Sequence, residues 1–211
     1  MQIIAGTADQ LPAGLLFDMA RYRHAVFVER LGWQLQPTGR LELDQFDRRD
    51  TVYVLAVNAA GKLVGMTRLL PTARPYLLAD VFPQLLGGAP LPRSPQVWEL
   101  SRFAALDPEA TASRAQLTFV SPLALDILSV AMSVAADEGA TRLISVSPVG
   151  VERILRHAGL VNERAGPPIR IEGRPLVACW IKVQRDWRPL REATAAAPPT
   201  DTKTPSVQRL N

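Results

Sequence analysis

A chain of 211 residues, 47% hydrophobic and 21% charged, is long enough to bury a core and too apolar for wholesale disorder. No apolar run reaches the length of a membrane span, the N-terminus lacks the features of a signal peptide, and the single cysteine excludes an internal disulfide, so we expect a cytoplasmic protein. The net charge of +4, carried mostly by arginine, indicates either the codon bias of a GC-rich genome or a basic face for an acidic partner.

In the first half of the chain, apolar residues at helical spacing predict a helix over residues 11–31, with Gly32 as its stop. Residues 34–50 show no periodicity and hold several carboxylates, which indicates a loop. The β-rich residues 51–57 and 63–70 flank a turn and predict an antiparallel hairpin. A short helix over 76–86, ended or kinked around Pro83, is predicted before a strand at 97–104.

In the second half, the pattern predicts helices over 121–138 and 151–157 and strands over 142–147 and 175–183. Ala, Pro and Thr dominate the end of the chain, so we expect residues 191–211 to form a disordered tail. Because strands and helices interleave, residues 1–190 are predicted to form one α/β (α+β) domain in which helices flank a mixed sheet.

The chain has no glycine-rich phosphate loop, no nucleophile elbow and no zinc-protease motif. Cys179 lies between Ala178 and Trp180 in a predicted strand, which favours a buried core thiol over a nucleophile. What remains is a set of charged residues beside apolar anchors in the first half. In a regular strand Glu99 and Arg102 would point to opposite faces, unless a bulge redirects one of them. Such charges need partners, and an ordinary ion-pair network is the alternative to a functional site.

These charged and aromatic residues, at their mutual spacings, resemble the hallmark set of the acyl-homoserine lactone synthases, the LuxI-type autoinducer synthases. The matching positions are Arg23, Phe27, Trp33, Glu42, Asp44, Asp47, Arg68, Phe82, Glu99 and Arg102. Residues 71–76 and 98–103 also look like this family, and the likeness extends from about residue 20 to residue 183. The resemblance implies a V-splayed mixed sheet similar to that of the GNAT N-acetyltransferases.

The resemblance implies an acyltransferase that joins an acyl chain from acyl carrier protein to the amine of S-adenosylmethionine. Lactonisation then releases 5′-methylthioadenosine and yields a quorum-sensing signal. S-adenosylmethionine is a substrate here, so we expect no cofactor and no metal. The residues that would bind it are Arg23, Phe27, Trp33, Asp47, Arg68, Phe82 and Phe103. The residues expected to be catalytic are Glu42, Asp44, Glu99 and Arg102. A carboxylate or a water held by Glu99 would be the general base, and the sequence does not decide which carboxylate takes the proton.

In the second half, the resemblance implies a pocket for the acyl chain and a docking face for the acidic carrier protein. The pocket candidates are Leu123, Met132, Ser145, Ser147 and Trp180. The docking candidates are Arg142, Arg153 and Arg156. Two alternatives stay open. A coenzyme A-dependent N-acyltransferase of the GNAT type would need a phosphate loop that the chain lacks, and a nucleic-acid-binding module would need a recognition element among its dispersed arginines. We expect no nucleic-acid or membrane partner.

Overall fold

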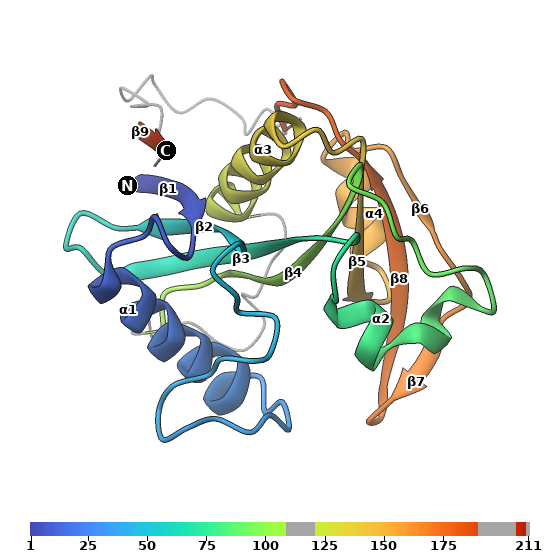
Figure 1. Ribbon diagram of the computed structural model, residues 1–211, viewed down its shortest axis with the longest axis horizontal. Coiled ribbons are helices and arrows are strands. Elements are labelled where there is room, and N and C mark those ends of the chain that lie inside the picture. The colour runs from blue at the N-terminus through green and yellow to red at the C-terminus, as the bar shows by residue number, and fades with distance from the viewer. Residues whose placement is uncertain (109–120, 190–205, 210–211) are drawn as a thin grey trace, which may run out of the picture.

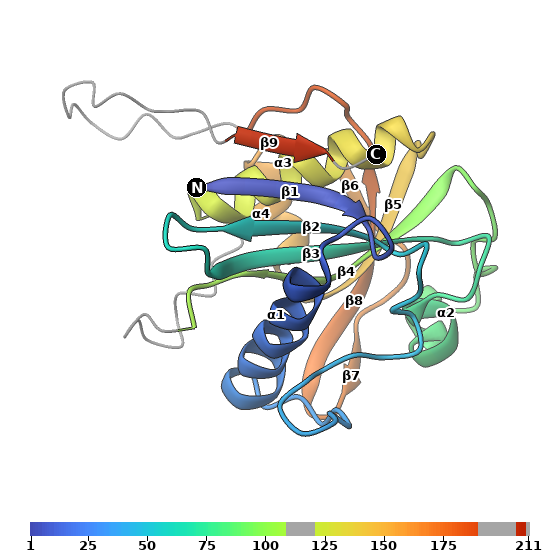
Figure 2. The same ribbon diagram turned by 60° about the vertical axis from the view of Figure 1, so that its left-hand side comes forward.

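The computed structural model describes residues 1–108, 121–189 and 206–209, which form a nine-stranded mixed sheet between helices (Figures 1 and 2). The strand order is β6-β8-β5-β4-β3-β2-β1-β9, and β7 pairs with β8. Only the β4–β5 and β1–β9 pairs in this described sheet are parallel. The predicted mixed sheet with flanking helices is therefore confirmed.

The strands are β1 (Gln2–Thr7), β2 (Val52–Val57), β3 (Leu63–Pro71), β4 (Val97–Ala105), β5 (Arg142–Pro148), β6 (Asn162–Arg164), β7 (Ile169–Ile171), β8 (Arg174–Lys182) and β9 (Ser206–Arg209). The sequence did not predict β1, β6, β7 or β9. The last three have only three or four residues, too few to show alternation, and Ala5 and Gly6 weaken the strand pattern of β1. The predicted disordered tail is wrong for β9, which lies parallel to β1. The rest of that tail lies outside the described residues.

The helices are α1 (Ala13–Arg23), the π-helix η1 (His24–Arg30), α2 (Leu77–Val81), the 3₁₀-helix η2 (Pro83–Leu86), α3 (Pro122–Asp137) and α4 (Val151–His157). The single helix predicted over residues 11–31 thus changes to a π-helix after Arg23, and Gly32, with a φ of 66°, ends it as expected. The Ser121 side chain accepts the N–H of Ala124 and starts α3. Within the described ranges, no helix has the length and apolarity to cross a membrane.

The sheet opens between β4 and β5. These strands pair only where residues 97–99 of β4 face residues 142–144 of β5, and the last pair is Glu99 with Ile144. Beyond Glu99 they diverge, and Figure 1 shows β2–β4 running across the view while β5 and β8 run down it. The V-shaped opening predicted from the family resemblance is present.

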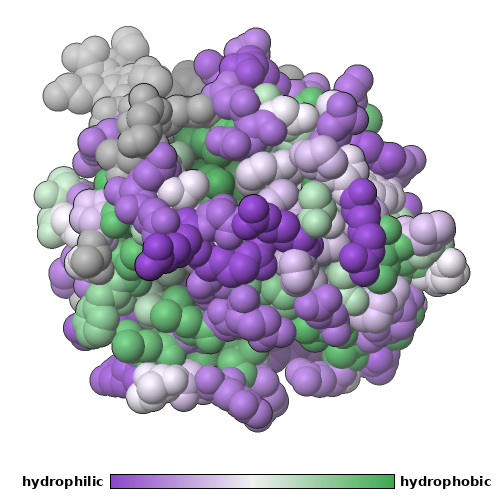
Figure 3. Space-filling model, in the orientation of Figure 1, coloured by the Kyte–Doolittle hydropathy of each residue, from purple (hydrophilic) through white to green (hydrophobic). Residues whose placement is uncertain are grey.

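Apolar side chains fill both faces of this bent sheet. One cluster lies beneath α3 and α4, a second packs against α1, and a third lies against α2. Cys179 is buried in the first cluster, and burial raises the pKa of its thiol to about 11, which confirms the predicted core thiol. Figure 3 shows hydrophobic side chains over α1 and hydrophilic ones across the centre of the same face.

Candidate active site

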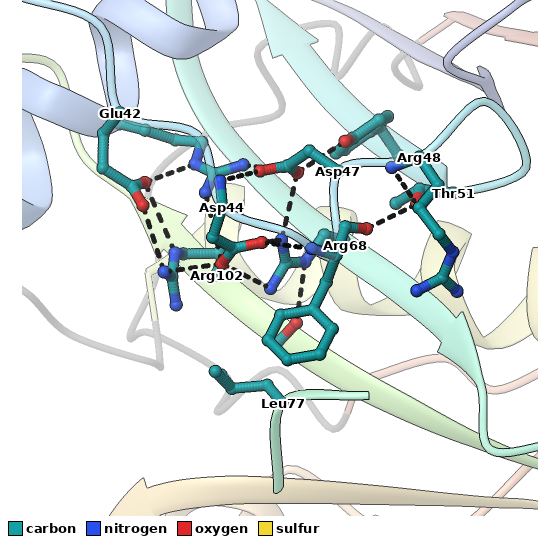
Figure 4. Close-up of polar contacts among 12 residues, drawn as sticks. Glu42, Asp44, Asp47, Arg48, Thr51, Arg68, Leu77 and Arg102 are labelled. Carbon is teal, nitrogen blue, oxygen red and sulfur yellow. Dashed lines mark hydrogen bonds and ion pairs between the residues drawn. The ribbon is translucent and has the colours of Figure 1, made fainter. Parts of the chain in front are cut away.

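Three guanidinium groups and three carboxylates meet on the face of the sheet that α1 and α2 cover (Figure 4). We call this group the ion cluster. Its members are Arg23, Glu42, Asp44, Asp47, Arg68 and Arg102. The arginines come from α1, β3 and β4, and the carboxylates come from the irregular segment between η1 and β2. Backbone bonds hold that segment in place, including one from the N–H of Glu42 to the carbonyl oxygen of Ala20 in α1.

The ion pairs of the first two arginines are short. Arg23 Nε lies 2.5 Å from Glu42 Oε2, and its Nη1 lies 2.7 Å from Asp47 Oδ1. Arg68 Nη1 lies 2.6 Å from Asp44 Oδ1 and 3.0 Å from Asp47 Oδ1. Both guanidinium groups are fully buried. The Nη2 atom of Arg23 makes no hydrogen bond and lies 3.7 Å from Asp44 Oδ2, so it keeps a donor for a further acceptor.

A β-bulge brings Arg102 into the ion cluster. Ser101 pairs with Arg68 and Ala104 pairs with Met66, so Arg102 and Phe103 together oppose one residue of β3. Arg102 has a φ of 51°, a conformation that costs a residue with a Cβ atom free energy. The sequence allowed for such a bulge, and the structure contains it.

Arg102 uses this redirection to bind two carboxylates. Its Nη2 atom lies 3.0 Å from Glu42 Oε1 and 2.9 Å from Asp44 Oδ2. Glu42 and Asp44 are thereby paired with arginine within the cluster, as Asp47 is, and the three positive charges match the three negative ones. The three predicted site carboxylates are thus already neutralised by arginines of the protein.

Asp47 is bound by four hydrogen bonds, two of them from Arg23 and Arg68. Its Oδ1 atom also accepts the hydroxyl of Tyr53 at 2.6 Å, and its Oδ2 atom accepts the N–H of Asp44 at 2.7 Å. Burial alone would raise the pKa of Asp47, but the charges of Arg23 and Arg68 outweigh it and hold the pKa well below its usual range. Asp47 therefore stays ionised and fixes the geometry of the cluster. The sequence analysis did not identify Tyr53, whose only signal was its place in a predicted strand.

Glu99 stands apart from the ion cluster. Its carboxylate is 1% exposed and accepts the backbone N–H groups of Leu77 and Leu78 at 2.9 and 2.6 Å. Burial raises its pKa to about 7, which those N–H groups and the nearby Arg68 only partly offset. Both oxygens thus anchor the start of α2, and a role as general base stays a prediction.

A pocket of about 370 Å³ occupies the opening between β4 and β5. At one end it is lined by Phe27, Trp33 and Arg102, and at the other by apolar side chains of α3, α4 and β8. The Phe27 and Trp33 rings are stacked with centroids 4.7 Å apart. The Arg102 guanidinium carbon lies 5.7 and 5.8 Å from these two ring centroids. One end can therefore hold a polar, charged group and the other an alkyl chain.

The pocket includes some predicted site residues and leaves out others. Phe103, Ser145 and Ser147 line it, as expected. Four other predicted residues are not among those that line the described pocket, and they pack within the hydrophobic clusters. Leu123 and Met132 pack in the cluster beneath α3, while Phe82 and Trp180 pack in the cluster against α2. Their apolar character and spacing could not separate a core position from a tunnel position.

The predicted docking arginines are exposed on the C-terminal arm of the V, which consists of β5 to β8 and α4, while β1 to β4 form the N-terminal arm. Arg142 pairs with Glu163 and stacks on Trp180 with its guanidinium carbon 4.2 Å from the ring centroid. Arg153 and Arg156 project from α4. The sequence analysis missed Ser101, which accepts the Nε–H of Arg68 at 3.1 Å and lines the pocket. Its signal was its position between Glu99 and Arg102.

Known proteins are similar to this chain in sequence and in fold. A sequence profile for the autoinducer synthase family matches residues 11–188. The acyl-homoserine-lactone synthase of Acinetobacter nosocomialis is 50% identical over 186 residues, which cover 87% of this chain and 100% of that protein. The crystal structure of TofI in a ternary complex with an inhibitor and MTA is 44% identical, with a TM-score of 0.74 over 89% of this chain and 94% of TofI.

Two further structures bear on the acyl donor and the fold. The structure of BjaI, a CoA-dependent acyl-homoserine lactone synthase, with SAM and isopentyl-CoA is 28% identical, with a TM-score of 0.76 over 87% of this chain and 84% of BjaI. A candidate N-acetyltransferase from Lactobacillus plantarum is 18% identical, with a TM-score of 0.52 over 87% of this chain and all of that protein, and it shares the fold alone. From the profile, the identities and the common fold, this chain belongs to the autoinducer synthase family, whose members are acyl-homoserine-lactone synthases.

Proposed function

We propose that this chain transfers an acyl group from acyl carrier protein to the amine of S-adenosylmethionine and then forms the lactone. The observation that carries the proposal is the pocket between β4 and β5, which has a charged aromatic end and an apolar end. The two substrates divide in the same way, since one is a small charged nucleoside and the other an acyl chain. Their reacting atoms would meet where the two ends join, beside Ser101 and Arg102.

S-adenosylmethionine would bind at the aromatic end. The Nε and Nη2 atoms of Arg102 donate hydrogen bonds to Glu42 and Asp44 of the ion cluster. Its Nη1 atom would therefore bind the substrate carboxylate. The faces of Phe27 and Trp33 would receive the sulfonium, where a cation–π contact contributes about 0.5–2 kcal/mol. Arg23 and Arg68 support this end indirectly by fixing Asp44 and Asp47.

The reaction has two bond-forming steps. The substrate amine, once deprotonated, attacks the thioester carbonyl, and the thiolate leaves with the proton to give an amide and a free thiol. A carboxylate oxygen of the same molecule then attacks the carbon attached to the sulfonium, closes the lactone and expels 5′-methylthioadenosine. All the electrons that this second step needs come from the carboxylate, so S-adenosylmethionine is a substrate and no further cofactor is required.

The proton acceptor would be a water held at the edge of the ion cluster. No carboxylate lies among the residues lining the described part of the pocket. Asp44 is the most exposed acid of the cluster, at 15% against 2% for Glu42 and 6% for Asp47. We therefore assign the water to Asp44, with Glu42 holding Arg102 in place. Glu99 would act as a positioning residue, because both of its oxygens bind the start of α2.

The acyl chain would lie at the other end, past Ser145 and Ser147 toward Leu128 and Leu155. Carrier protein is strongly acidic, and Arg142, Arg153 and Arg156 form an exposed basic set for it on the same arm of the V. The two substrates are made in the cytoplasm, which is where we expect the enzyme to work. Coenzyme A thioesters are the alternative donors.

The test is a reaction of the purified chain with S-adenosylmethionine and matched thioesters of carrier protein and coenzyme A. Mass spectrometry should find the acyl-homoserine lactone and 5′-methylthioadenosine in equal amounts, with a higher kcat/KM for the carrier-protein donor. Arg102→Ala should abolish both products, whereas Arg40→Ala, which removes an exposed arginine that does not line the pocket, should not. Preference for coenzyme A would overturn the donor, and absence of both products with every donor would overturn the reaction.

A further inference from the structure

A second arginine faces the pocket from the opposite arm of the V. Arg174 is the first residue of β8 and lines the pocket together with Arg102. It follows a two-residue turn in which Glu172 and Gly173 have φ values of 46° and 76°. A turn of this kind fixes the hairpin of β7 and β8 tightly, so the position of Arg174 at the pocket is well defined.

Arg174 bridges the two arms of the V. Its Nη2 atom donates a 2.7 Å hydrogen bond to the carbonyl oxygen of Leu31, which caps the C-terminal end of η1. Leu31 also lines the pocket, so the bond crosses the pocket rim from the C-terminal arm to the N-terminal arm. The side chain of Arg174 is exposed, whereas that of Arg102 is 5% exposed. Arg174 is thus a cation at the rim, and Arg102 is a cation in the interior.

The charges around the rim favour an anionic ligand. Among the residues that line the described pocket, the charged ones are Arg102 and Arg174, and neither wall contributes a carboxylate. Arg102 is committed to the ion cluster by two carboxylates. The guanidinium of Arg174 has five N–H donors. Within the described part of the chain it pairs with no carboxylate, since its hydrogen bond goes to the neutral carbonyl oxygen of Leu31.

The register of the sheet sets the distance from this cation to the interior. Cys179 of β8 pairs with Ser145 of β5, and Arg174 precedes Cys179 by five residues. At about 3.4 Å per residue, Arg174 lies ~17 Å along β8 from Cys179, the residue that pairs with Ser145. A phosphopantetheine arm has about 13 bonds between phosphorus and sulfur. An extended peptide chain covers about 3.3–3.6 Å with every three backbone bonds, so an extended arm of this length spans ~15 Å. A thioester in the interior would therefore leave the phosphate of its arm near the rim.

We propose that Arg174 binds the phosphate of the phosphopantetheine arm that carries the acyl group. The proposal rests on the proposed function, because it names how the acyl donor of that reaction is held. Carrier protein and coenzyme A both contain this arm, so the phosphate is the feature they share. On binding, the guanidinium exchanges the Leu31 carbonyl for the stronger acceptor, which releases the bridge between the two arms of the V.

The test compares donors that differ only in the phosphate. Steady-state rates are measured at saturating S-adenosylmethionine with S-acyl pantetheine and S-acyl 4′-phosphopantetheine that carry the same acyl group. The unmodified chain should prefer the phosphorylated donor by about tenfold or more in kcat/KM, as expected for hydrogen bonds between charged groups. Arg174→Ala should remove this preference through KM, and Arg174→Lys should restore part of it. Acyl carrier protein and acyl-coenzyme A as further donors show which source of the arm depends more on Arg174.

Arg170→Ala is the matched control. Arg170 is an exposed arginine of the same hairpin that donates to the turn carbonyl of Gly173 and lies outside the pocket lining. It should keep the preference for the phosphate. Equal preference in Arg174→Ala and the unmodified chain, or its equal loss in Arg170→Ala, would overturn the proposal.

A binding measurement separates this proposal from the reaction itself. Calorimetry gives the Kd of 4′-phosphopantetheine and of pantetheine without turnover. Tighter binding of the phosphorylated compound that disappears in Arg174→Ala would support the phosphate site even if no lactone forms with any donor. Equal binding of the two compounds by the unmodified chain would refute the site even if lactone is made.

Discussion

Glu99→Gln tests whether the ionised carboxylate of Glu99, buried at the start of α2, lowers the stability of the folded protein. The side chain is 1% exposed and binds the N–H groups of Leu77 and Leu78. Glutamine keeps the shape of the glutamate side chain and, like the protonated acid, carries no charge. Its carbonyl oxygen accepts hydrogen bonds, whereas its NH2 group does not. The substitution therefore isolates the effect of the buried charge.

The sign follows from the raised pKa of Glu99. The ordinary value of 4.5 in the unfolded chain rises to about 7 in the folded protein, so the folded state binds this proton more tightly. Stability from this group is fully present below pH 4.5 and is lost as the pH rises through about 7. The difference corresponds to ~3 kcal/mol, at about 1.4 kcal/mol for each pKa unit. Glutamine has no charge to bury and escapes this loss.

The assay is urea unfolding of the parent chain and of Glu99→Gln at several pH values between 5 and 8. The free energy of unfolding of the variant should gain ~3 kcal/mol relative to the parent across this range, so the variant is the more stable protein at pH 8. Gln96→Ala, which alters an exposed residue in the turn before β4, should follow the parent at every pH. A constant difference between Glu99→Gln and the parent would refute the reasoning. So would a difference that moves in favour of the parent, because the backbone N–H groups would then stabilise the carboxylate more than burial disfavours it.

Three further substitutions test the ion cluster, the aromatic wall and the docking face. Asp47→Asn should lower the free energy of unfolding by about 3–5 kcal/mol, since it leaves Arg23 and Arg68 buried without their shared counter-charge, and an unchanged urea midpoint would contradict this. Because the pKa of Asp47 is lowered, its contribution is present above pH 3.8 and lost as the pH falls, so the parent should lose more stability than Asp47→Asn between pH 5 and pH 3. Trp33→Ala should raise the KM for S-adenosylmethionine severalfold while Trp33→Phe keeps it, and equal values in both would argue against stacking. Arg153→Glu should raise the KM for the carrier-protein donor and leave that for S-acyl pantetheine unchanged, with an effect that shrinks as salt is added.

The sequence alone determined the long elements and the chemistry of the site. α3, β2, β3, β4 and β5 follow from clear periodicity and turn signals, because each is long enough to show its own pattern. The spacing of arginines, carboxylates and aromatic residues identified the family before any fold was known.

Only the tertiary structure decided how the charges are used. The partners of the ion cluster lie 19 to 60 residues apart, and no local pattern says that Arg102 would pair with Glu42 or that Glu99 would bind α2 instead. The bulge at Arg102 decides which face that side chain joins, and it depends on how β4 pairs with β3. The pocket likewise exists because β4 and β5 part after Glu99, and with it come Leu31 and Arg174, two residues with no motif of their own. Sequence patterns record what one element needs, whereas the pairing of charges and the opening of a sheet depend on contacts between elements that are distant along the chain.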